Sequence, residues 1–170
     1  IVKALPDRNI FFVPDRNLAH FIAEQAPEKN FIYNEGYCPT HERMQTEEIE
    51  KVKGEHPGAL VLAHPECVKA VFELVEYVGS TSGIIKYATE SEGKEFIICT
   101  EEGVAHELKQ KNPDKAFYFT DTLPVCPDMK LVTLEKVLHV LKTGENEVHM
   151  EAELGEETRR PLERMLELAR

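Results

Sequence analysis

The feature that most constrains the fold of this chain is an internal repeat. The segment LAHFIAEQAPEKNFIY (residues 18–33) aligns with VAHELKQKNPDKAFYF (residues 104–119) at an offset of 86, with five identities in sixteen positions where chance gives about one. Shorter matches extend the alignment at offsets between 83 and 88: IVK at Ile1 with IIK at Ile84, CP at Cys38 with CP at Cys126, IEKV at Ile49 with LEKV at Leu134, and HPE at His64 with HME at His149. Because the offsets drift so little, the copies differ only by small loop insertions. The sequence therefore predicts one structural unit repeated in tandem.

Short apolar runs alternate with amphipathic helical patterns along the chain. The predicted strands cover residues 10–13, 31–33, 59–63, 96–100, 116–119 and a short run near Val148. The predicted helices cover residues 17–25, 46–55, 66–77, 81–88, 102–111, 133–142 and 156–169. Short strands without polar alternation, each followed by a helix, are typical of a parallel sheet covered on both faces. The predicted fold class is α/β, built from tandem αβα units with short parallel sheets.

Charge and hydropathy argue against two classes of partner. With 20 Lys+Arg and 31 Asp+Glu the formal net charge is −11, whereas a nucleic-acid backbone requires a cationic face. The longest apolar runs are far shorter than the roughly 20 residues that span a bilayer, and the N-terminus has no signal-peptide layout. We expect a cytoplasmic protein with neither a nucleic-acid nor a membrane partner. The opening IVKAL is typical of a helix end without a start signal, so we also expect the later part of a longer chain.

The four cysteines are too scattered for a disulfide framework, so we expect free thiols or metal ligands. Only Cys38 and Cys126 are equivalent under the repeat, each opening a Cys-Pro loop, which suggests thiolates converging on one centre. Two thiolates alone make a poor metal site, and a third repeat with its own cysteine would complete the set. The alternative is that both are buried apolar cysteines. Cys67 and Cys99, which lie within apolar patterns, fit that alternative better.

Candidate acid–base and anion-binding groups lie near predicted strand ends. His41 lies three residues after a cysteine, and the HPE triplet carrying His64 and Glu66 follows the strand at 59–63. Ligands of parallel α/β sheets gather at this end of the strands, where an imidazole and a carboxylate can act as general base and acid. Ser80 and Thr81 precede a helix and are suited to bind a phosphate or carboxylate. The alternatives are a helix-entry histidine, a first-turn carboxylate and an ordinary N-cap.

Six motifs occur together in a recognisable order. They are PDRNLA (14–19), GYCPTH (36–41), HPEC (64–67), GST (79–81), TEEG (100–103) and CPDMK followed by TLEKV (126–137). In this order they resemble quinolinate synthase, an iron–sulfur enzyme family of NAD biosynthesis. The resemblance implies a triangular protein of three similar, Rossmann-like αβα domains, each giving one cysteine to a central four-iron four-sulfur cluster.

The same resemblance implies a division of the chain into domains. Residues 1–56 would be the later part of the second domain, residues 57–144 the third domain, and residues 145–170 a closing strand and helix that return to the first domain. That helix is then expected to leave its apolar stripe of Leu162, Met165, Leu166 and Ala169 partly uncovered within this chain.

The resemblance further implies a reaction, in which iminoaspartate and dihydroxyacetone phosphate condense to quinolinate with loss of phosphate and water. Cys38 and Cys126 resemble two of the three cluster ligands, the third being expected upstream of Ile1, and the iron left open would act as a Lewis acid. The other site residues implied are His41 and His64 as contacts of substrate carboxylates, Glu66 as the acid–base carboxylate, and Ser80 with Thr81 as the anion-binding turn.

Two further expectations follow. The resemblance implies functional coupling to an L-aspartate oxidase or an aspartate dehydrogenase, and it implies only a strand edge at His149-Met150-Glu151. The alternative from another functional class is a non-catalytic α/β binding protein that holds a small anionic metabolite at the Gly-Ser-Thr turn without metal.

Overall fold

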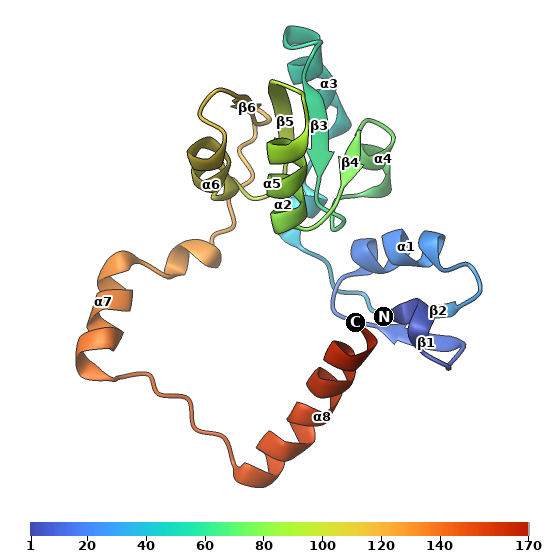
Figure 1. Ribbon diagram of the computed structural model, residues 1–170, viewed down its shortest axis with the longest axis vertical. Helices are drawn as coiled ribbons and strands as arrows, with labels where there is room; N and C mark the ends of the chain where they lie inside the picture. The colour runs from blue at the N-terminus through green and yellow to red at the C-terminus, as the bar shows by residue number, and fades with distance from the viewer. Residues whose placement is uncertain (170) are drawn as a thin grey trace.

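The computed structural model describes residues 1–169 and has an α/β architecture (Figure 1). The strands are β1 (Asn9–Phe12), β2 (Asn30–Tyr33), β3 (Leu60–Ala63), β4 (Tyr77–Val78), β5 (Glu95–Cys99) and β6 (Ala116–Tyr118). The helices are α1 (Arg16–Gln25), α2 (Pro39–Glu42), α3 (Thr46–Glu55), α4 (Lys69–Phe72), α5 (Thr81–Glu90), α6 (Val104–Lys111), α7 (Leu134–Thr143) and α8 (Ala152–Leu168), with 3-10 turns at Val2–Ala4 and Met129–Leu131. All strand pairs are parallel. The predicted class, α/β with short parallel sheets, is confirmed.

The larger sheet has the strand order β4-β3-β5-β6. Alternate residues of its central strands point to opposite faces: Val61 and Ile97 pack with α3 and α4, whereas Leu62 and Ile98 pack with α5 and α6. Burial of each such side chain contributes roughly 1.5–3 kcal/mol. Helices therefore cover both faces (Figure 1), and this three-layer arrangement is the rigid frame of the site.

The smaller sheet contains β1 and β2, joined by α1. Its register runs from Asn9 opposite Asn30 to Phe12 opposite Tyr33. Two strands alone do not bury both faces of a sheet, and Phe11 is accordingly exposed. This unit corresponds, under the repeat, to β5, α6 and β6 of the larger sheet.

Helix α3 packs on the larger sheet, although the sequence groups it with residues 1–56. Ile49 and Val52 are buried in one cluster with Val61 and Ile97. The connection through α2 therefore carries the chain from the smaller sheet to the larger one before residue 56. The division at residues 56 and 57 concerns the domains of the whole protein and stays a prediction.

The predicted helix at residues 66–77 is wrong in its extent. Only Lys69–Phe72 form α4, and the chain then enters the short strand β4. Glu76 explains the difference, because its backbone N–H donates to the Val61 carbonyl while its carboxylate accepts the Val61 N–H at 2.5 Å. Pairing with the sheet edge draws this segment out of the helix.

The predicted strand near Val148 is also wrong. Residues 145–151, all within the described chain, form no strand, and Val148 is 87% exposed. Under the repeat this segment corresponds to β3, which is hydrogen-bonded to β4 on one side and β5 on the other. A strand requires such neighbours, and the described residues place none beside Val148.

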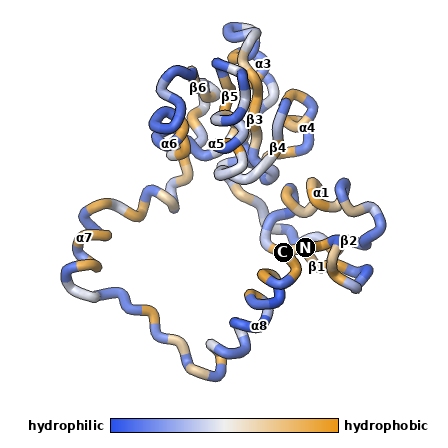
Figure 2. Tube along the Cα trace, viewed as in Figure 1, coloured by the Kyte–Doolittle hydropathy of each residue, from blue (hydrophilic) through white to orange (hydrophobic). Residues whose placement is uncertain are grey.

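Helices α7 and α8 lie outside the two sheets (Figure 1), and neither helix has a buried residue. Apolar residues recur along both helices (Figure 2), and those of the expected α8 stripe, Leu162, Met165, Leu166 and Ala169, are exposed as predicted. The return of α8 to another domain stays a prediction. Within residues 1–169, no helix is both long enough and apolar enough to cross a membrane.

Candidate active site

The candidate site lies where the carboxyl ends of the two central strands meet. From β3 the chain turns to the edge strand β4, and from β5 it turns to β6 on the opposite side. Such a switch point opens a crevice at the carboxyl edge of a parallel sheet. His64 directly follows β3 and Thr100 directly follows β5. The short helix α2 brings a third group, the buried His41, to the same edge.

His41 is the centre of a hydrogen-bond network at this edge. Its Nδ1 lies 3.1 Å from the Cys38 Sγ and 3.2 Å from a Glu66 carboxylate oxygen. Its Nε2 lies 3.0 Å from the Thr100 hydroxyl. The arrangement assigns the proton to Nδ1, with Nε2 accepting from the Thr100 O–H. The His64 ring stacks on the His41 ring at a centroid distance of 4.5 Å.

Three metal-ligand types converge in this network. The ligand atoms of Cys38, His41 and Glu66 all lie within 4.8 Å of one another. A thiolate, an imidazole and a carboxylate are all donors for transition metals. The structure thus brings together three of the residues that the sequence singles out, from the loop before α2, from α2 itself and from the turn after β3.

The environment sets the charges of His64 and Glu66. The hydrogen bond from His41 lowers the pKa of the Glu66 carboxyl below its usual 4.5, although partial burial opposes that shift. Burial lowers the pKa of His64 below 6.5, and the neighbouring His41 lowers it further. At neutral pH, Glu66 is therefore a carboxylate and His64 a neutral imidazole.

The alternatives considered for these two residues fare differently. Glu66 lies in a turn before α4, which begins only at Lys69, so the carboxylate is outside the first helical turn. His64 does bond to the backbone, because its Nδ1 accepts the Glu66 N–H at 3.3 Å. That bond requires the neutral ring to carry its proton on Nε2.

The four cysteines separate into accessible and inert thiols. Cys38 and Cys126 are partly exposed, whereas Cys67 and Cys99 are fully buried. Burial raises the pKa of the Cys99 thiol to about 12, and it raises that of Cys67 strongly as well. Since the thiolate is the ligand form, Cys67 and Cys99 are core residues, and the accessible pair is the one that the repeat relates.

Cys126 reaches the same edge of the sheet by another route. Its backbone N–H lies 3.3 Å from a carboxylate oxygen of Glu101, the neighbour of Thr100. The loop before it, residues 122–125, lines a small cleft together with Thr40 and Arg43 of the Cys38 segment. Among the described residues, Cys126 does not join the group formed by Cys38, His41 and Glu66.

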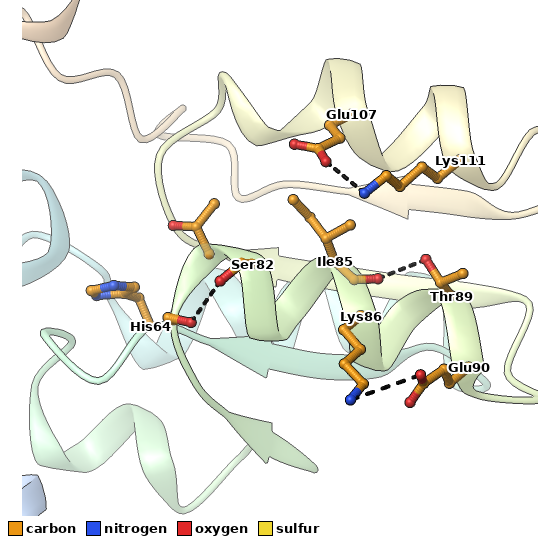
Figure 3. A pocket seen from close by; sticks show the side chains of 10 residues that line it. His64, Ser82, Ile85, Lys86, Thr89, Glu90, Glu107 and Lys111 are labelled. Atoms are coloured by element: carbon orange, nitrogen blue, oxygen red, sulfur yellow. Dashed lines mark hydrogen bonds and ion pairs between the residues drawn. The ribbon is translucent and has the colours of Figure 1, made fainter. Parts of the chain in front are cut away.

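A groove of about 760 Å³ runs from His64 between α5 and α6 (Figure 3). Ser80 and Thr81 line it at the start of α5. The Ser80 hydroxyl accepts the Gly83 N–H at 3.2 Å, so Ser80 is an N-cap as well as a groove residue. The lysines of the groove are paired with carboxylates, as Lys111 is with Glu107 at 2.7 Å.

Asn17 and Thr100 are part of the site but were missed as functional candidates in the sequence. The Asn17 amide donates to the Glu66 carbonyl at 3.0 Å and to the Glu42 carboxylate at 2.7 Å. Thr100 donates to His41 as described. Both belong to motifs identified above, PDRNLA and TEEG, but neither residue type has a distinctive chemistry by itself.

A family model and several curated relatives that are similar to this chain carry the same family description. A family model described as quinolinate synthetase A protein matches residues 1–167. The curated quinolinate synthase of Clostridioides difficile (strain 630) is 50% identical over 169 residues, 99% of this chain and 56% of the relative. That of Fusobacterium nucleatum is 47% identical with the same shares, and that of Aquifex aeolicus is 43% identical over 99% of this chain and 54% of the relative.

The chain thus spans little more than half the length of these relatives. Since the family model covers nearly every residue and agrees with the ordered motifs and the fold, the chain belongs to the quinolinate synthase family.

Proposed function

We propose that the protein carrying this chain condenses iminoaspartate with dihydroxyacetone phosphate to quinolinate, releasing phosphate and two molecules of water. The observation that carries the proposal is the convergence of Cys38, His41 and Glu66 within 4.8 Å, next to a groove that begins at His64 and Ser80. The proposal concerns the whole protein, because this chain spans 56% of the length of its relatives.

Two of the four cysteines, Cys38 and Cys126, are suited to hold a four-iron four-sulfur cluster. Cluster ligands must be accessible and able to ionise, and the partly exposed Cys38 and Cys126 meet the first condition while the buried pair does not. We assign Cys38 and Cys126 as two of three ligands, the third coming from outside these 170 residues. Held by three protein ligands, such a cluster would supply Lewis-acid chemistry toward a substrate oxygen or nitrogen at the iron that no cysteine binds.

Glu66 is the proposed acid–base group. The condensation requires protons to be removed from carbon and returned to hydroxyl groups that leave as water. A carboxylate held ionised by His41 can accept the first proton and return it in the dehydration steps. Thr100 fixes the His41 ring from the other side at 3.0 Å, so the carboxylate keeps its orientation between steps.

The groove is the proposed binding site for the anionic parts of the substrates. Helix α5 is ten residues long, and the first N–H groups of a helix together with its dipole favour an anion at the N-terminus. Ser80 and Thr81 add hydroxyl donors there, which suits the phosphate of dihydroxyacetone phosphate. Neutral His64, with its proton on Nε2, is suited to donate a hydrogen bond to a substrate carboxylate.

The same proposal includes a supplying enzyme and a location. Iminoaspartate is an imine of an α-keto acid and hydrolyses in water, so an enzyme that forms it must work alongside. An L-aspartate oxidase or an aspartate dehydrogenase, in the cytoplasm, would meet that need. A metal-free binding protein would use the groove but would leave the convergence of Cys38, His41 and Glu66 without a role.

The test uses the complete gene product, purified without oxygen. Iron, sulfide and quinolinate formation are measured for the wild type and for Cys38→Ser, Cys126→Ser, Cys67→Ser and Cys99→Ser. We expect the first two variants to lose the cluster and the activity. The last two are matched controls and should keep both, because a serine hydroxyl at position 67 can still donate to the Cys99 carbonyl as the thiol does. Normal iron content in Cys126→Ser, or quinolinate formation by an iron-free wild type, would contradict the proposal.

A further inference from the structure

Asp15 is a buried carboxylate that contacts two backbone amides from different segments. It is 3% exposed. Its Oδ1 accepts the Leu18 N–H at 2.8 Å and thereby caps α1. Its Oδ2 accepts the Cys38 N–H, also at 2.8 Å. One side chain thus joins the start of a helix to the backbone of a cysteine 23 residues further along the chain.

Glu101 makes a corresponding pair of contacts in the other unit, to a cysteine N–H and to an N–H at the start of a helix. It is 8% exposed. Its Oε2 accepts the N–H of Gly103, the N-cap of α6, at 2.7 Å, and its Oε1 accepts the Cys126 N–H at 3.3 Å. Lys130 lies 3.0 Å from the same Oε1 and compensates the charge.

The two carboxylates are equivalent under the internal repeat. Positions 15 and 101 differ by 86, the offset that aligns residues 18–33 with residues 104–119. The residue types differ, aspartate in one copy and glutamate in the other, yet both join a cysteine N–H to the N-terminus of the helix in their own unit. The contact to the cysteine N–H recurs, although the side chain and the helix N–H that it accepts differ.

A carboxylate is required for this pattern. Each contact pair presents two N–H donors, and a carboxylate offers two acceptor oxygens where an amide offers one. A buried charge is costly unless hydrogen bonds compensate it, and here charge-assisted bonds and the positive end of a helix do so. The backbone of each cysteine is therefore held against a rigid helix rather than left to a mobile loop.

We propose that Asp15 and Glu101 are positioning residues that fix the backbones of Cys38 and Cys126, so that both thiols are preset for the cluster. The inference rests on the proposed function, because it takes these cysteines as cluster ligands. Neither carboxylate is a ligand itself. Each acts on the cluster only through the cysteine whose N–H it accepts.

The test compares Asp15→Asn and Glu101→Gln with the wild type in the complete gene product. The amides keep the size of the side chain but leave one N–H without its acceptor. Loss of such supporting contacts typically weakens metal binding about 10- to 100-fold, so iron release to a chelator should accelerate by that order. The electron paramagnetic resonance spectrum of the reduced cluster should also change, because the thiolate orientations change. Asp15→Glu and Glu101→Asp retain both acceptors and should return release toward the wild-type rate.

A matched control makes the same carboxylate-to-amide change elsewhere, at Glu76, whose two oxygens also contact two donors, the Val61 N–H and the Lys53 ammonium. Glu76→Gln alters the group that accepts the Val61 N–H at 2.5 Å, without contact to either cysteine, and should leave release rate and spectrum unchanged. Equal acceleration in this control would mean general destabilisation and would overturn the inference, as would wild-type release and spectra in both amide variants. If Asp15→Asn does not fold, the iron release and spectrum of Glu101→Gln, whose side chain lies in the four-stranded unit, test the inference alone. An iron-free wild type would instead overturn the proposed function, and this inference with it.

Discussion

Replacing Glu66 with glutamine isolates its proton-transfer role from its place in the network. The amide has nearly the same shape and can still contact His41, whose Nδ1 lies 3.2 Å from the carboxylate. It cannot take up and return a proton. Loss of a general acid–base group lowers turnover about 10²- to 10⁴-fold, which corresponds to a barrier higher by about 2.7–5.4 kcal/mol.

The assay measures quinolinate formation and iron content on one preparation of the complete gene product. We expect Glu66→Gln to keep its iron, because neither proposed cysteine ligand changes. Glu73→Gln, an exposed carboxylate beyond α4, is the control and should turn over like the wild type. If Glu66→Gln turns over as fast as Glu73→Gln, the acid–base role is refuted, and the residue only shapes the turn after β3.

Three further predictions concern stability. Folding lowers the pKa of His64 below 6.5 and that of Glu66 below 4.5. The contribution of each group to the free energy of unfolding is therefore complete above its unfolded-state pKa, and it is lost as the pH falls through its folded-state pKa. His64→Gln should therefore flatten the loss of stability below pH 6.5 in denaturation curves, and an unchanged slope would contradict the shift. Thr100→Val leaves the buried His41 Nε2 unpaired and should lower the free energy of unfolding, measured by urea denaturation, by about 1–3 kcal/mol. Thr100→Ser keeps the hydroxyl and should lower it much less; an equal loss in both variants would show that the hydroxyl is not used. Leu166→Gln should destabilise the complete gene product by more than the roughly 0.5 kcal/mol typical of surface sites, because α8 is expected to pack on another domain, and a neutral change would argue against that packing.

Local sequence patterns predict a strand correctly where the fold places another strand beside it, and incorrectly where it does not. The apolar run at 96–100 becomes β5, which lies between β3 and β6. The run near Val148 looks similar but has no strand beside it among the described residues and stays irregular. β4 is two residues long, too short for any periodicity, and exists because it pairs with β3. Strand formation depends on partners, which a local pattern does not contain.

The sequence by itself determined the repeat, the α/β class and the equivalence of Cys38 and Cys126 under that repeat, because each follows from the order and spacing of residues along the chain. Only the tertiary structure decided which groups meet: Thr100 contacts His41 across 59 residues, and Asn17 contacts Glu66 across 49. The strand order brings the loops after β3 and β5 to one edge, and α2 reaches that edge from the other unit. Hydrogen bonds between such distant residues are set by the crossovers of the chain, which hydropathy and spacing do not encode.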